Sequence, residues 1–270
     1  RNDMVLLIDV GNTEIRIGVR DDDGLIGSWR MTTDSLKTSD ELGGTLLRFL
    51  KFDNIDPKGI RGVIICSVVP NIMYSLTRGI NKYFSTEPII VTNDFDSGIC
   101  LNMANPKELG ADRLAKLAAG FEIYGGPVMV IDYGTATTFD VVDEKGVFVT
   151  GLTAPGVNIC AQALFTNTAQ LPKIEIKRPG SIYCRDIVSC IQSGIYYGHV
   201  GEARYIIENV KKELNMPDMK VVATGGMARE IGNGNGIFDV LDPFLSFKGL
   251  FILYKRNIDN IRRREYAAGH

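Results

Sequence analysis

Two short segments of the chain combine an aspartate, a glycine and a threonine directly after an apolar run. Residues 9–13 read Asp-Val-Gly-Asn-Thr, and residues 132–135 read Asp-Tyr-Gly-Thr. A glycine after a buried strand leaves backbone N–H groups free to face a phosphate, while the aspartate can hold hydrated Mg²⁺. One such segment alone is more often an ordinary hairpin turn. Because two occur in matching surroundings, they predict a clamp for nucleotide phosphates.

Residues 110–113, Gly-Ala-Asp-Arg, place a carboxylate beside a guanidinium. Phosphoryl transfer to an alcohol benefits from a base that accepts the hydroxyl proton, and an unperturbed aspartate, with a pKa of about 4, is ionised at neutral pH. Asp112 is therefore a candidate base. Arg113 can hold an acceptor carboxylate in a bidentate pair or stabilise phosphate charge. The alternative is an ordinary Asp-Arg pair on a helix surface, which composition alone favours.

A glycine pair at Gly225 and Gly226 follows a short apolar run and Thr224. Glycines there would let a base or ribose approach the backbone closely, although a close-packed turn between strand and helix gives the same pattern. The sequence contains no Gly-Lys pair, which excludes a P-loop. The two aspartate-glycine segments are therefore the better candidates for a nucleotide site.

The elements that must position these residues occur twice. Residues 5–9 predict a strand, alternating apolar residues at 15, 17 and 19 predict a second, and a third begins at residue 25 after the turn 21–24. The same order recurs at 128–132, 139–142 and 147–149, with a turn at 143–146. Such a repeat predicts a duplicated α/β domain. We expect an N-terminal domain at 1–118 and a C-terminal domain at 119–270.

Helices and further strands complete each half and predict a mixed sheet in both. A capping box at 38–41 opens a helix to about residue 49. The other predicted elements are a strand at 62–69, a helix from there to about 83, a helix from Asn105-Pro106 to Tyr124, helices at 157–167, 187–214 and 246–262, and a strand at 220–223.

Composition narrows the function classes. The chain has 270 residues, 45% of them hydrophobic and 23% charged, with a net charge of −2 and five cysteines. These values indicate a globular protein, and the absence of a basic stripe, apart from the short run Arg262–Arg264, argues against a nucleic-acid partner. No apolar run reaches the roughly 20 residues of a membrane span. An odd number of cysteines without a C-x-x-C pair favours a reduced, cytoplasmic setting.

The ordered set of motifs resembles the type III pantothenate kinases over nearly the whole chain. It comprises Asp9-Val-Gly-Asn-Thr13, Ser67-Val-Val-Pro70, Asn105-Pro106, Gly110-Ala-Asp-Arg113, Asp132-Tyr-Gly-Thr-Ala-Thr-Thr-Phe-Asp140 and Ala223-Thr-Gly-Gly226. The resemblance implies two duplicated actin-like, or ribonuclease H-like, α/β domains with mixed sheets and an ATP cleft between them. It also implies a homodimer that converts ATP and pantothenate to ADP and 4′-phosphopantothenate, the first step of coenzyme A synthesis.

The resemblance assigns roles to individual residues. Asp112 would accept the hydroxyl proton, and Asp132 would bind a monovalent cation, K⁺ or NH₄⁺, beside the Mg²⁺ that accompanies ATP. The residues implied for ATP binding are Asp9, Val10, Gly11, Asn12, Thr13 and Thr135. Those implied for pantothenate binding are Gly110, Ala111, Asp112 and Arg113.

The chain departs from the family pattern at three positions. Met103 and Ile187 stand where the family usually has a tyrosine and a threonine, and Thr150 stands where a glycine pair usually begins. The first two remove hydroxyls expected near pantothenate. Two alternatives therefore remain: a kinase of the same fold with another hydroxylated acceptor, or a non-catalytic regulatory homologue. Retention of Asp9, Asp112 and Asp132 argues against the second.

Overall fold

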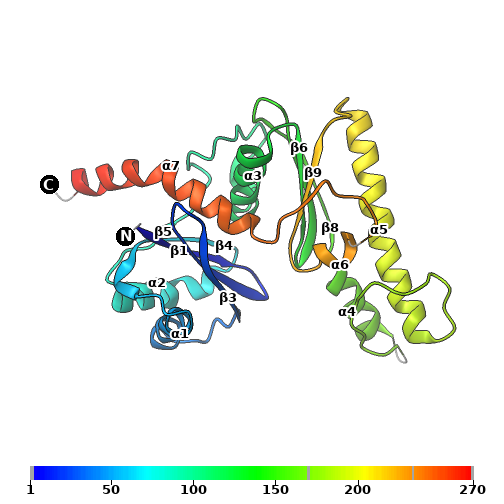
Figure 1. The fold of residues 1–270 in the computed structure, drawn as a ribbon, viewed down its shortest axis with the longest axis horizontal. Helices are drawn as coiled ribbons and strands as arrows, with labels where there is room; N and C mark the ends of the chain where they lie inside the picture. The colour runs from blue at the N-terminus through cyan, green and yellow to red at the C-terminus, as the bar shows by residue number, and fades with distance from the viewer. Residues whose placement is uncertain (1–2, 169–170, 233, 269–270) are drawn as a thin grey trace. The chain divides into compact units, whose positions relative to one another are not determined.

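The computed structural model describes residues 3–168, 171–232 and 234–268. The chain divides into two compact units (Figure 1). Unit 1 comprises Arg1–Gly98, Ala104–Ala119 and Ser246–His270, and unit 2 comprises Ile99–Met103 and Gly120–Leu245. The division after Ala119 lies one residue from the expected boundary, but the C-terminal residues belong to unit 1 rather than to the expected domain 119–270.

Unit 1 is built on a five-stranded sheet of order β3-β2-β1-β4-β5. The central strand β1 (Met4–Val10) runs antiparallel to β2 (Glu14–Arg20), which pairs with β3 (Leu25–Thr32). On its other side β1 pairs in parallel with β4 (Ile60–Ser67), and β4 pairs in parallel with β5 (Ile89–Ile90). The predicted meander and the mixed sheet are confirmed.

Both faces of this sheet are buried, because successive side chains of a strand point to opposite sides. Leu6 and Ile8 pack with the buried residues of α1 (Ser39–Phe52) and α2 (Pro70–Phe84). Val5 and Leu7 pack with α3 (Ala111–Tyr124) and α7 (Leu245–Ala268). The packing of α7 on β1 explains why the C-terminal residues join unit 1.

The predicted capping box forms at the start of α1. The Glu41 backbone N–H donates to Thr38 Oγ1 at 3.3 Å, and the Thr38 backbone N–H donates to Glu41 Oε2 at 2.8 Å. The helix extends to Phe52, three residues beyond the predicted end. The backbone N–H groups of Thr38 and Glu41, which have no carbonyl partner within the helix, are thus hydrogen-bonded.

Unit 2 repeats this architecture with a sheet of order β10-β9-β6-β7-β8. Read from its other edge, the order is that of unit 1 strand for strand, with the central β6 antiparallel to one neighbour and parallel to the other. The predicted duplication is therefore confirmed. The strands are β6 (Val128–Tyr133), β7 (Ala136–Val142), β8 (Phe148–Pro155), β9 (Lys220–Thr224) and β10 (Val240–Leu241).

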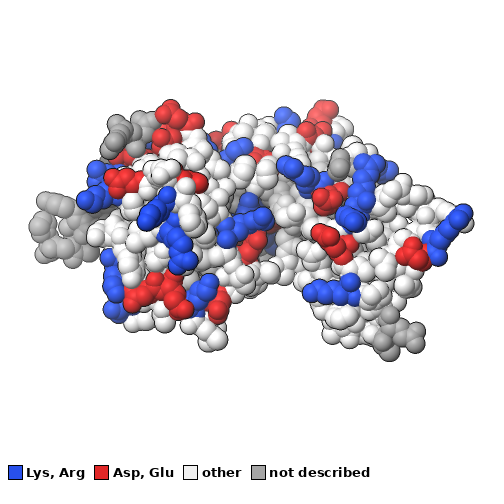
Figure 2. Space-filling model, turned by 60° about the horizontal axis from the view of Figure 1, so that its bottom comes forward, with Lys and Arg blue, Asp and Glu red and all other residues white. Residues whose placement is uncertain are grey.

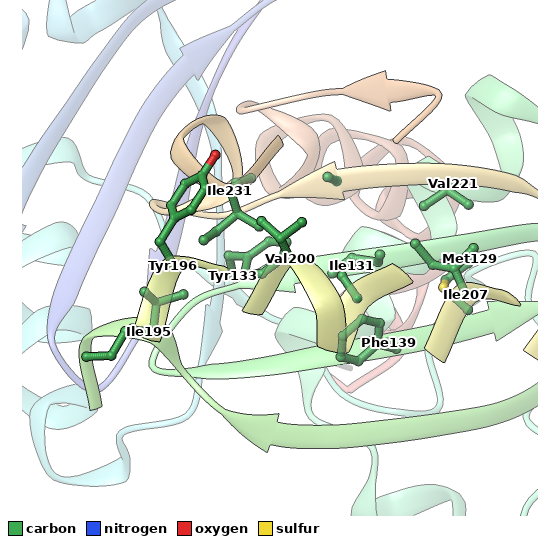
Figure 3. Close-up of a cluster of buried hydrophobic side chains, with 14 of the residues drawn as sticks. Met129, Ile131, Tyr133, Phe139, Ile195, Tyr196, Val200, Ile207, Val221 and Ile231 are labelled. Carbon is green, nitrogen blue, oxygen red and sulfur yellow. The ribbon is translucent and has the colours of Figure 1, made fainter. Parts of the chain in front are cut away.

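One face of the second sheet packs against α4 (Val157–Asn167), α5 (Ile187–Glu213) and α6 (Ala228–Gly232). Figure 3 shows the centre of this core, where Met129 and Ile131 of β6 lie with Phe139 of β7 and with Val200 and Ile207 of α5. The alternate residues Met129, Ile131 and Tyr133 of β6 all belong to this core, and a turn follows directly at the carboxyl end of the strand.

The structure differs from the sequence predictions in the segment after Asn105. A short 3-10 helix, η2 (Pro106–Glu108), is followed by Leu109 in an extended conformation, and α3 begins only at Ala111. The predicted continuous helix from Asn105-Pro106 is therefore wrong at its start. The break matters because it places Asp112 in the first turn of a helix rather than in its middle. A second 3-10 helix, η1 (Pro57–Gly59), precedes β4.

Candidate functional site

Asp9 lies at the carboxyl end of the central strand of unit 1. Asp9 is only 7% exposed. The parallel register places Cys66 of β4 opposite Asp9, and the thiol donates a hydrogen bond from Sγ to Asp9 Oδ1 at 3.3 Å. Burial, followed by the negative charges of Asp9 and Asp112, raises the pKa of the Cys66 thiol. The thiol therefore stays protonated and acts as a donor to the carboxylate.

The turn after β1 presents its tip to solvent. The Gly11 N–H donates to the Glu14 carbonyl oxygen at 3.0 Å, and Thr33 Oγ1 donates to the Gly11 carbonyl oxygen at 2.6 Å. Asn12 and Thr13 are exposed. These two hydrogen bonds thus fix the base of the turn while the polar tip stays accessible, as a phosphate-binding loop requires.

Asp112 stands in the first turn of α3, where the helix dipole favours a negative charge. A Cβ on Gly110 would lie 2.6 Å from Asp112 Oδ1, so only glycine leaves room for this carboxylate position. Lys116 Nζ lies 3.1 Å from Asp112 Oδ2. Burial raises the pKa of the carboxyl, but Lys116 and the backbone N–H and charge of Arg113 outweigh it, and the pKa is lowered overall. Asp112 is thus ionised at neutral pH, as a base must be.

The first turn and the expected base lie near the same point of unit 1. The charges of Asp9, Asp112 and Lys116 all act on the Cys66 thiol. Asp9 and Asp112 thus both lie close enough to the Cys66 thiol for their charges to raise its pKa.

In unit 2 the turn after β6 meets the glycine pair after β9. Gly225 has φ +95, and a Cβ there would lie 2.5 Å from Asp132 Oδ1 and 2.6 Å from the backbone N and C of Tyr133. The Gly134 N–H donates to the Ala136 carbonyl oxygen at 3.1 Å. Gly225 therefore permits the close approach of the turn after β9 to the turn after β6. The sequence allowed two explanations for the glycine pair, a nucleotide contact or a close-packed turn, and this approach is the packing that the second describes.

The N-terminus of α4 reaches the same turn. Gly156, the N-cap residue, provides no side-chain cap, and a Cβ on it would overlap the carbonyl oxygens of Thr135 and Gly134. The first N–H groups of α4 have no capping side chain at Gly156, which suits them to an anion. Thr135 is exposed beside them. Unit 2 thus brings together residues 132–135, the start of α4 and the Gly225 turn.

Two threonines flank Asp132 in the sheet. Thr138 of β7 and Thr224 of β9 are its direct partners in register. Their hydroxyl oxygens are buried, and neither has a hydrogen-bond partner among the described residues. A carboxylate between two unsatisfied hydroxyls is an oxygen-rich arrangement that can accommodate a hard cation.

Sequence reasoning missed three residues of these sites. Cys66 directly precedes the Ser67-Val-Val-Pro70 motif, Lys116 stands four residues after Asp112, and Gly156 directly precedes a predicted helix. The i,i+4 spacing could have identified Lys116.

The two departures from the family pattern, Met103 and Ile187, both lie in unit 2, and Ile187 is 55% exposed.

The surface and the helices add two observations. Figure 2 shows lysine and arginine side chains interspersed with acidic ones over the face drawn. In the part of the chain that the structure describes, no helix has the length and apolarity to cross a membrane, and no three His, Cys, Asp or Glu residues are grouped to hold a metal. A cation at Asp132 would thus need hydroxyl or ligand oxygens as well.

Two units with the same mixed five-stranded sheet, each with an Asp-x-Gly turn after its central strand, define the actin-like class of two-domain proteins. The fold of two solved structures agrees. Ethanolamine utilization protein EutJ from Carboxydothermus hydrogenoformans matches with a TM-score of 0.53 at 14% identity, over 93% of this chain and 89% of that one. ROK hexokinase from Thermus thermophilus matches with a TM-score of 0.50 at 13% identity, over 95% and 99%.

Sequence comparison goes further than the fold. The family model described as "Type III pantothenate kinase" matches residues 5–209. A curated protein named type III pantothenate kinase, from Agathobacter rectalis, is 48% identical over 253 residues, which cover 94% of this chain and 97% of that protein. The chain belongs to the type III pantothenate kinase family.

Proposed function

We propose that this chain transfers the γ-phosphoryl group of ATP to the hydroxyl of pantothenate, giving ADP and 4′-phosphopantothenate in the first step of coenzyme A biosynthesis. The observation that carries the proposal is the 48% identity, over 94% of the chain, to a protein named type III pantothenate kinase. The ionised carboxylate of Asp112 in the neighbourhood of the first turn is chemically consistent with it.

The residues of unit 1 would bind and activate both reactants. The exposed tip at Asn12 and Thr13 would donate hydrogen bonds to ATP phosphates, with Asp9 behind it at the end of β1. Arg113 would hold the pantothenate carboxylate through its planar guanidinium. Asp112 would accept the hydroxyl proton as the oxygen attacks the γ-phosphorus. In unit 2, Thr135 would contact ATP beside the start of α4.

Two cations belong to the proposal. Mg²⁺ would accompany ATP and neutralise charge on its phosphates. A monovalent cation, K⁺ or NH₄⁺, would be held by Asp132, and the buried hydroxyls of Thr138 and Thr224 fit it because they are oxygen atoms that lack a hydrogen-bond partner among the described residues. Bound there, it would supply positive charge next to the second turn.

A homodimer is also part of the proposal, and unit 2 offers a surface that suits it. Large apolar side chains are exposed on α4, before α5 and on the first turn of α5, where burial against a second copy would remove them from water. They are Ile159, Leu164, Phe165, Ile182, Tyr183, Ile187 and Val188.

The test is an assay of ADP release and of product mass with purified protein, ATP, Mg²⁺ and pantothenate, with and without K⁺. Formation of phosphopantothenate is expected, and its absence under all cation conditions would overturn the proposal. Asp112→Asn should reduce turnover by about 10²-fold or more while ATP still binds. Asp40→Asn is a matched control, because Asp40 is an exposed carboxylate in the same unit that also pairs with a lysine.

A second acceptor is the competing candidate, favoured by Met103 and Ile187. Neither side chain offers a hydroxyl, and a typical hydrogen bond contributes about 0.5–1.5 kcal/mol, enough to alter acceptor choice. A screen of hydroxylated compounds under the same conditions separates the two, since faster turnover of another acceptor than of pantothenate would favour it. ATP binding without turnover of any acceptor would instead indicate a regulatory homologue.

A further inference from the structure

Lys116 is a buried cation that none of the motifs of the sequence contains. Its side chain is 8% exposed, although lysine is seldom buried unless it is paired. It lies on α3, one turn after Asp112, on a helix whose alanines at 115 and 118 pack against the sheet of unit 1. The ammonium is therefore held by the packing of the helix rather than free on its surface.

The ion pair of Lys116 with Asp112 is unequal in burial. The Asp112 side chain is 25% exposed, against 8% for Lys116, and the two charged atoms are 3.1 Å apart. A fixed ammonium beneath a partly accessible carboxylate orients the oxygen Oδ2, and the carboxylate also accepts a hydrogen bond from the Arg113 backbone N–H. The other oxygen, Oδ1, points to the space beside Gly110, since a Cβ added there would lie 2.6 Å from it.

The groups around this pair come from three elements of unit 1. Asp112 faces Lys116 and Arg113 on its own helix, and the charges of Asp112 and Lys116 act on the thiol of Cys66 of β4, which donates to Asp9 of β1. Cys66 is a protonated, neutral donor, and Asp9 adds negative charge. Among these groups, Lys116 thus supplies a buried positive charge in direct contact with the Asp112 carboxylate.

We propose that Lys116 is a positioning residue of the reaction, which holds the carboxylate of Asp112 ionised and oriented with Oδ1 toward the acceptor hydroxyl. The inference rests on the proposed function, in which Asp112 accepts the proton. Lys116 acts through Asp112 and touches neither reactant. Without its charge, only Arg113 would oppose the effect of burial, so the pKa of Asp112 would rise and part of the carboxylate would be protonated at a pH where the wild type is ionised.

The experiment compares three variants by the pH dependence of kcat and by KM for ATP. Lys116→Met keeps the length of the side chain and removes its charge, and Lys116→Arg keeps the charge. Lys82→Met is the matched control, because Lys82 forms an exposed ion pair with Asp40 at 2.7 Å in the same unit. For Lys116→Met we expect a fall in kcat of about tenfold or more, KM for ATP within about twofold, and an acid limb displaced to higher pH.

The acid limb separates positioning from support of the fold. Activity is compared only at pH values where each variant is folded by circular dichroism, because there a loss of stability does not move the limb. An unchanged limb in Lys116→Met, or a kcat within about twofold of the wild type, would overturn the proposal. If Lys116→Met does not fold, Lys116→Arg decides: the limb should stay at the wild-type pH, and a limb displaced upward would contradict the role of the charge.

A readout without turnover keeps this inference distinct from the proposed function. The ¹³C chemical shift of the Asp112 carboxyl can be followed against pH in the wild type and in Lys116→Met. Titration of Asp112 at higher pH in the variant is expected even if pantothenate is not the acceptor. Identical titration curves would refute the effect of Lys116 on Asp112, whatever the substrate.

Discussion

Gly225→Ala is the substitution for which the structure gives the most specific expectation. Gly225 has φ +95, a conformation that L-residues adopt with strain of about 1–3 kcal/mol. The added Cβ would also lie 2.6 Å from the backbone of Tyr133, which cannot move as a flexible side chain would, and overpacking of this kind costs about 1–3 kcal/mol. We therefore expect a loss of about 2–6 kcal/mol in the free energy of unfolding.

Gly226→Ala is the matched control, because a Cβ on the adjacent glycine would meet no atom within 4 Å. Urea unfolding of the ligand-free protein, followed by circular dichroism, measures both variants. The control should stay within about 0.5 kcal/mol of the wild type. Equal losses in the two variants, or a Gly225→Ala protein as stable as the wild type, would refute the close approach of the Gly225 turn to residues 132–133.

Three further expectations concern unit 1. Thr38→Ala should cost about 1 kcal/mol in urea unfolding, because it removes the N-cap of α1, and a loss below about 0.3 would contradict that role. Gly249→Ala should destabilise by about 1–3 kcal/mol, since its Cβ would overlap the backbone of α3. Gly44→Ala is the control, because a Cβ there meets open space in α1, and it should be neutral or stabilising by up to about 1 kcal/mol. A larger loss of stability in Gly44→Ala than in Gly249→Ala would count against this packing. The lowered pKa of Asp112 should add stability that is full above its unfolded pKa near 4 and is lost as the pH falls through the lower folded value. The stability difference between wild type and Asp112→Asn should therefore shrink on acidification, and a constant difference would refute this linkage.

The fold was largely predictable from the sequence because local patterns of apolar and turn residues indicate the repeated strands. Alternating apolar residues and turn glycines identified the three strands of each meander, and the capping box marked the start of α1. The strands β5 and β10 were missed, since two residues show no periodicity. Membership of the last helix in unit 1 was also missed, because it depends on long-range packing of Phe247 and Leu250 against β1 that no local pattern encodes.

The candidate site was predictable at its motifs and not at their neighbours. Asp9 and Asp132 end apolar runs, which a reader of the sequence can see. Cys66 became a partner of Asp9 only through the parallel register of β4, a strand 57 residues away along the chain. Lys116 seemed an ordinary helical lysine by composition, and only the packing of α3 against the sheet buries it.

The shared sheet order makes the two copies comparable position by position. Asp9 and Asp132 are equivalent, yet the residues opposite them in register differ: Arg16 and Cys66 in unit 1, Thr138 and Thr224 in unit 2. One copy has a positive charge built into its own chain, while the other has neutral hydroxyls that a dissolved ion could complete. Under the proposed function, the turn of unit 1 has a permanent positive charge beside its aspartate, whereas the charge beside the aspartate of unit 2 depends on the concentration of monovalent cations in solution.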